Sequence, residues 1–290
     1  MMNFQQIPVV IFATMRRSGS HFAMHRALSS VRISGPNAFG AHINSFSLRR
    51  LDLKKPFDVA KVLARRKLNY FYIDAQHNRP RWSGDPGAES MRDSLYAWLS
   101  VEGKSKPDER QLDFLAINIE DMPLDIVVDS VRRILSPNPY FATTVTSFPI
   151  FVTLRSLRSI ALSRTHLLEK RTSDVMASGF RNLPVKVWED HYLASVKGVT
   201  NAGHPVVPLH YKQGVETQGQ SFVDAFTSNV DLPCRSFVPE WVQGYVMPDA
   251  TGSSFVGSGI NKEQQVVKSI KDRESRLSEF DYLLERCPLA

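Results

Sequence analysis

Cysteine is scarce in this sequence, and no metal-binding cluster is apparent. Only two of the 290 residues are cysteines, Cys234 and Cys287, and they have no metal-ligand spacing. His21 and His25 are four residues apart, but no glutamate or third ligand accompanies them as in helical zinc sites. We therefore expect no disulfide framework and no bound metal, and a reducing, cytoplasmic location.

Long apolar segments are also missing. Nowhere do about 18 apolar residues follow one another, so we expect no transmembrane segment. Hydrophobic residues make up 42% of the chain and charged residues 22%, which excludes collagen-like and wholly disordered proteins. We expect a single domain over residues 1–290, in which residues 80–147 include a variable region that forms part of a cleft wall.

The charge balance is basic. The chain has 36 lysines and arginines against 29 aspartates and glutamates, a net charge of +7, which favours anionic ligands. The basic residues are dispersed and form no stripe interleaved with aromatic residues, so we do not expect nucleic acid as a partner. A non-catalytic binder of anionic polymers remains an alternative interpretation.

Short apolar runs alternate with segments of helical periodicity, which predicts an α/β sheet covered by helices on both faces. The predicted strands cover residues 9–14, 70–74, 114–119, 150–154 and 206–211. The predicted helices cover residues 20–29, 58–68, 89–101, 124–135, 159–170, 185–199, 222–226 and 263–284. Loops are expected at residues 79–87 and 137–146, beside a substrate cleft.

The first predicted strand runs directly into a turn that suits an anion. A helix N-terminus presents unpaired N–H groups and the positive end of its dipole, so phosphate or sulfate binds there readily. Gly19 lets the backbone approach the anion closely, and Ser18 and Ser20 add hydroxyl donors. Arg16 and Arg17 add positive charge, although a plain helix cap beside two solvated arginines is the alternative.

A second turn of similar chemistry follows a later strand. Arg155 closes the predicted strand at residues 150–154, and Ser163 lies eight residues further on, in a predicted helix. Both side chains can converge on one anion at the carboxyl edge of a parallel sheet, where open α/β sheets bind ligands. Two anion sites predict a nucleotide with two anionic groups.

Together the two turns resemble those of the sulfotransferases that use 3′-phosphoadenosine 5′-phosphosulfate (PAPS). In that family the first turn reads Lys or Arg, Ser-Gly-Ser/Thr, a variable residue and often an aromatic, and residues 17–22 read Arg-Ser-Gly-Ser-His-Phe. The second reads Arg-Asp/Asn-Pro-Arg-Asp-x-x-x-Ser. Arg155, Arg158 and Ser163 match this pattern, whereas Ser-Leu replaces the usual Asp/Asn-Pro.

The resemblance implies a P-loop-like three-layer α/β/α sandwich with a mainly parallel sheet. It also implies that the turn at residues 17–20 binds the 5′-phosphosulfate and that Arg155 and Ser163 bind the 3′-phosphate. Arg17 stands where many members carry a lysine. Because an arginine donates no proton at neutral pH, its role would be electrostatic.

Further cofactor contacts are implied by the same resemblance. His21 occupies the variable place of the first turn, and Phe22 falls where an aromatic packs against the adenine. Weaker similarity covers residues 190–211. A loop that contains Gly257 and Gly259 is similar to the family's segment that closes over the nucleotide.

A hydroxyl acceptor also needs a general base, which the family supplies as His or Glu. Three candidates remain open. His42 lies where some members place a Gly-Glu pair after the first helix, and His77 follows a strand expected to end at the ligand edge. Glu120 follows the predicted strand at residues 114–119, near the position of the histidine in cytosolic members.

The sequence therefore predicts a sulfotransferase that moves the sulfuryl group of PAPS to a hydroxyl or amine of a small molecule, lipid or glycan. A P-loop-type kinase is an alternative, although no Gly-x4-Gly-Lys-Ser/Thr motif and no obvious acidic pair for Mg²⁺ are present.

Overall fold

The structure is a computed structural model that describes residues 7–33, 38–44, 69–74, 79–82, 113–135, 147–157, 159–161, 163–164, 183–234 and 236. For most of residues 38–44, 69–74 and 79–82 it describes the backbone and the strand register, not the side chains. The helices predicted at residues 58–68, 89–101 and 263–284 and the loop predicted at 137–146 lie outside the described residues.

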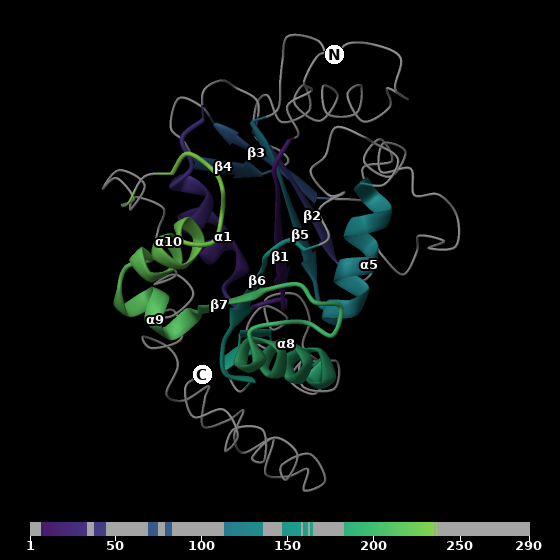
Figure 1. Cartoon of the computed structure of the whole chain (residues 1–290). Coiled ribbons are helices and arrows are strands. Elements are labelled where there is room, and N and C mark those ends of the chain that lie inside the picture. The colour runs from purple at the N-terminus through teal and green to yellow at the C-terminus, as the bar shows by residue number, and fades with distance from the viewer. Residues whose placement is uncertain are drawn as a thin grey trace, which may run out of the picture.

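Seven strands form one sheet in the order β4-β3-β2-β5-β1-β6-β7 (Figure 1). The strands are β1 (Val9–Thr14), β2 (Ala38–Asn44), β3 (Asn69–Asp74), β4 (Arg79–Trp82), β5 (Phe114–Glu120), β6 (Ile150–Leu154) and β7 (Val206–His210). Strands β2, β5, β1, β6 and β7 run parallel, whereas β3 and β4 each run antiparallel to the preceding strand. The carboxyl ends of the five parallel strands therefore meet at one edge.

Helices lie on both faces of the sheet (Figure 1). The helices are α1 (Ser20–Ser29), α5 (Leu124–Leu135), α8 (Val185–Lys197), α9 (Tyr211–Glu216) and α10 (Gln220–Thr227). α1 and α10 cover one face, and α5 and α8 cover the other. The prediction of a mainly parallel α/β sheet is confirmed. None of the helices in the described residues is long and apolar enough to cross a membrane.

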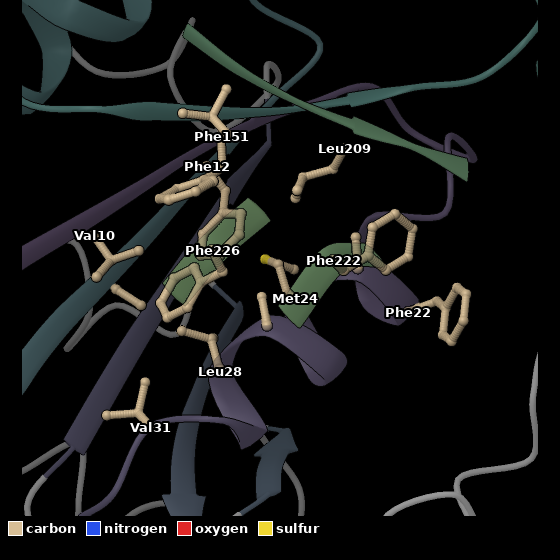
Figure 2. Packing of buried hydrophobic residues seen from close by; sticks show 14 of the residues in the cluster. Val10, Phe12, Phe22, Met24, Leu28, Val31, Phe151, Leu209, Phe222 and Phe226 are labelled. Carbon is tan, nitrogen blue, oxygen red and sulfur yellow. The ribbon is translucent and has the colours of Figure 1, made fainter. Parts of the chain in front are cut away.

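Aromatic side chains fill the core between the sheet and the α1/α10 layer (Figure 2). Phe12 of β1 lies 5.4 Å from Phe151 of β6, measured between ring centroids, and Phe226 of α10 lies 5.1 Å from Phe151. α1 contributes Met24 and Leu28 to the same cluster. Burial of each such side chain contributes about 1.5–3 kcal/mol, so this layer fixes α1 against the sheet.

Several elements begin and end where the sequence predicts. The strands at residues 9–14 and 150–154 and the helices at 20–29 and 124–135 match residue for residue. β3, β5, β7, α8 and α10 are also confirmed, with shifted ends.

β2, β4 and α9 are not predicted by the sequence pattern. The predicted loop at residues 79–87 is wrong at its start, because Arg79–Trp82 forms β4. In this sheet β4 pairs only with β3, and an edge strand tolerates Pro80 because it needs no donor on its open side.

Candidate functional site

Three strand-to-helix connections lie next to one another at the carboxyl edge of the sheet. β6 lies beside β1, and β7 lies beside β6. The connections are residues 15–19 between β1 and α1, residues 155–156 between β6 and a helical segment that begins at Leu157, and the junction of β7 with α9 at Tyr211. The two anion turns predicted from the sequence are therefore neighbours in space.

The β1–α1 turn has an unusual backbone. Arg17 and Gly19 have φ angles of 74° and 91°. Glycine is needed at position 19, because a Cβ there would lie 2.2 Å from Cδ2 of Tyr211. No side chain in the described residues caps α1, and a helix N-terminus of this kind suits an anion.

Ser18 has a structural role in this turn. Its hydroxyl is fully buried, donates to the carbonyl oxygen of Met15 at 2.7 Å, and also bonds to the hydroxyl of Thr153 on β6. In this structure the Ser18 hydroxyl therefore bonds to two partners inside the protein, and its predicted contact with an anion stays a prediction. Ser20, the first residue of α1, is also buried, whereas His21 is exposed.

Side chains from the two predicted anion turns contact each other directly. Nε of Arg17 donates to Oγ of Ser163 at 2.9 Å. Nη1 of Arg155 donates to the backbone carbonyl of Arg17 at 3.1 Å. These contacts join residues 146 and 138 positions apart in the sequence. The sequence predicts that Arg155 and Ser163 converge on one anion, which stays a prediction. In this structure each of them contacts Arg17, which the resemblance assigns to the other phosphate.

Both the backbone and the guanidinium of Arg155 make contacts. The indole N–H of Trp188 on α8 donates to the Arg155 carbonyl at 2.9 Å, and the guanidinium lies 4.2 Å from the ring centroid of Tyr211. Its Nε has no hydrogen-bond partner within the described part of the chain. Burial lowers the pKa of Arg155, and the positive charge of Arg17 lowers it further. Burial also lowers the pKa of Arg17.

An acidic pair lies on the other side of β1. Asp121 Oδ1 accepts hydrogen bonds from the Arg16 backbone N–H and from Nη2 of Arg164, each at 2.8 Å. Arg16 Nε lies 3.5 Å from Oε2 of Glu120 and 3.6 Å from Oδ2 of Asp121. In this structure the Arg16 guanidinium therefore lies beside two carboxylates, and its predicted contact with an anion stays a prediction.

This edge of the sheet carries surplus positive charge. In the part of the chain that the structure describes, it carries Arg16, Arg17, Arg155 and Arg164, and the carboxylates of Glu120 and Asp121 pair with Arg16 and Arg164. Among the described residues, neither Arg17 nor Arg155 forms an ion pair with a carboxylate. The partly desolvated guanidinium groups of Arg17 and Arg155 repel each other, so a bound anion would offset this repulsion.

The three candidate bases fall in different places. Glu120 ends β5, is buried, and pairs in register with Thr14 at the end of β1, beside the anion turn. His42 lies within β2, which was not predicted, and its backbone pairs with Asn118, two residues before the edge. The side chain of His42 lies outside the described residues.

The reason for choosing His77 is wrong. β3 runs antiparallel to β2, and its last residues pair with the first residues of β2, as Ile73 does with Ala38. β3 therefore ends at the edge opposite the anion turns. His77 itself lies outside the described residues.

Phe22 belongs to the core. Its side chain is 2% exposed, and its ring packs edge-on against Phe222 and Tyr211, at 5.3 and 6.3 Å between centroids. In this structure the Phe22 ring therefore packs against other rings of the core, and its predicted contact with an adenine stays a prediction. Gly257 and Gly259 lie outside the described residues.

The departure from the family pattern after Arg155 has a simple structural consequence. Ser156 Oγ accepts the backbone N–H of Ser159 at 3.1 Å and donates to its hydroxyl at 2.7 Å. A side-chain oxygen that accepts an N–H three residues later is typical of a helix N-cap. Ser156 thus caps the helical segment that carries Ser163.

Sequence reasoning missed several residues of this site. Asp121, Arg164, Trp188 and Thr153 carried no signal, because each acts through a partner more than 30 positions away. Tyr211 was noted only as the end of a family-like stretch. The chain matches no protein-family model, no curated protein and no solved structure.

Proposed function

We propose that this protein is a sulfotransferase that transfers the sulfuryl group of PAPS to a hydroxyl or amine acceptor. One observation carries the proposal: Arg17 and Ser163, from two turns that each suit an anion, meet at 2.9 Å, with Arg155 bonded to the same turn. A nucleotide with phosphates on both the 3′ and 5′ positions of one ribose matches two anion sites that lie side by side.

The hydrogen-bond roles are compatible with this assignment. Ser163 Oγ accepts from Arg17 Nε, so its own proton remains to be donated to a phosphate oxygen. The terminal nitrogens of Arg17 and the first-turn N–H groups of α1 would neutralise the 5′-phosphosulfate. Ser163 is almost fully buried in this structure, so a phosphate reaches its hydroxyl only after neighbouring side chains shift.

The chemistry would be an in-line displacement. The acceptor oxygen or nitrogen forms a bond to sulfur, the bond between sulfur and the bridging oxygen of the 5′-phosphate breaks, and the acceptor proton passes to a base. Most of the catalysis would come from positioning and from charge neutralisation by Arg17. We propose Glu120 as the base, because it lies at the end of β5 beside β1, with His42 as the competing candidate.

A kinase remains the competing activity. Glu120 and Asp121 form an acidic pair at the sheet edge, which the sequence did not suggest. Both Oδ atoms of Asp121 already face arginine groups, an arrangement better suited to holding the turn than to binding Mg²⁺.

Calorimetry with three nucleotides tests the proposal. 3′-Phosphoadenosine 5′-phosphate should bind at least about tenfold more tightly than AMP, the effect of one charge-assisted contact set. Arg155→Ala should remove most of this preference and leave AMP binding nearly unchanged. Equal affinities for the two nucleotides would refute the assignment, and tight Mg²⁺-dependent binding of ATP would favour the kinase.

A further inference from the structure

Tyr211 lies where the anion turns meet. It is the first residue of α9, directly after β7, and its side chain is buried. Its ring contacts both turns: the Arg155 guanidinium lies 4.2 Å from the ring centroid, and Gly19 leaves room for the ring only because it lacks a Cβ. The same ring contacts Phe22 of α1 edge-on.

The position of the Arg155 guanidinium depends on few contacts. One hydrogen bond joins its Nη1 to the Arg17 carbonyl, and Nε has no partner within the described residues. Burial removes water from this cation, as the lowered pKa of Arg155 indicates. The negative face of an aromatic ring replaces part of that hydration and restricts a long, flexible side chain to one orientation.

The contact with Gly19 adds a second constraint. A ring that touches the turn and the guanidinium at once fixes the distance between them. Since Arg155 also donates to the Arg17 carbonyl, the turn, the Arg155 guanidinium and the Tyr211 ring each contact the other two. Arg155 is thereby held in place before any ligand arrives, which lowers the entropy cost of binding.

We propose that Tyr211 is a positioning residue that holds Arg155 against the β1–α1 turn, and that the face of its ring supplies this contact. This inference rests on the proposed function, in which Arg155 binds the 3′-phosphate. If Tyr211 holds Arg155 in this way, the junction of β7 with α9 contributes to the selection of a 3′-phosphorylated nucleotide.

Calorimetry with 3′-phosphoadenosine 5′-phosphate and with AMP tests the inference on two variants. Tyr211→Phe keeps the ring, so the preference for the bisphosphate should stay within about twofold of the unmodified protein. Tyr211→Leu removes the ring, so binding of the bisphosphate should weaken by about tenfold while AMP binding changes little. Tyr192→Leu is the control for loss of a tyrosine ring elsewhere, because Tyr192 stacks on Trp188.

A double-mutant cycle without ligand separates this inference from the proposed function. Unfolding of Arg155→Met, Tyr211→Leu and the double variant should show a coupling of about fivefold in the unfolding equilibrium constant. Absent coupling, or a Phe variant that loses as much preference as the Leu variant, overturns the inference while the function stands. Coupling without any preference for the bisphosphate overturns the proposed function and the phosphate role of Arg155.

Discussion

Replacing Asp121 with asparagine tests whether the carboxylate pair holds the anion turn. Asp121 has a φ of 59°, a left-handed conformation that asparagine adopts as readily, so the substitution changes charge and little else. Its Oδ1 accepts from the Arg16 backbone N–H and from Arg164, both at 2.8 Å. An amide oxygen can accept both bonds, but without the negative charge.

The expected loss of unfolding free energy follows from the burial of Asp121 and Arg164. The side chains of Arg164 and Asp121 are 10% and 8% exposed, so solvent screens their interaction little. In the variant a neutral amide oxygen accepts the two hydrogen bonds in place of a carboxylate. Each bond is then weaker by about 1 kcal/mol. Arg164 also loses the carboxylate that lies 2.8 Å from its Nη2, which brings the expected loss of unfolding free energy to about 2–4 kcal/mol.

Urea denaturation of the unmodified protein and of Asp121→Asn measures this loss, and the slope of free energy against urea should stay unchanged. Asp129→Asn is the matched control. Asp129 pairs with Arg133 at 3.0 Å on the outer face of α5, where the two side chains are 59% and 42% exposed, so the loss should stay below about 0.5 kcal/mol. Equal losses in the two variants would refute the structural role of Asp121.

Three further predictions concern chemistry and pH. Arg17→Ala should lower sulfuryl-transfer turnover by about 10²–10³-fold, with a smaller loss of nucleotide affinity. Turnover within threefold of that of the unmodified protein would contradict charge neutralisation by Arg17. Glu120→Gln should lower turnover about 10²-fold at unchanged nucleotide affinity, while His42→Gln should not; the reverse result would reassign the base. Burial lowers the pKa of His191 and His204 in the folded protein. Just below about pH 6.5, these two histidines therefore bind protons in the unfolded chain but not in the folded one. The unfolding free energy should therefore fall as the pH decreases from 7.5 to 5.5 in urea titrations, and a rise would exclude this linkage.

The elements with strong local patterns were predictable from the sequence. β1 and β6 are short apolar runs that begin and end as predicted, because a strand buried on both faces leaves a continuous apolar signal. β2 and β4 left no such signal. β2 contains Gly40 and His42, and β4 contains Pro80, so their pairing depends on neighbouring strands and not on local propensity.

For the candidate site, the sequence by itself determined which turns offer charge and N–H donors to an anion. Arg17, Gly19, Arg155 and Ser163 are recognisable because their chemistry depends on short-range spacing after a strand. That Arg17 meets Ser163, that Ser18 turns inward, and that β3 ends at the opposite edge were decided only by the tertiary structure. Strand order and direction set these contacts, and both depend on pairing between segments far apart in the chain.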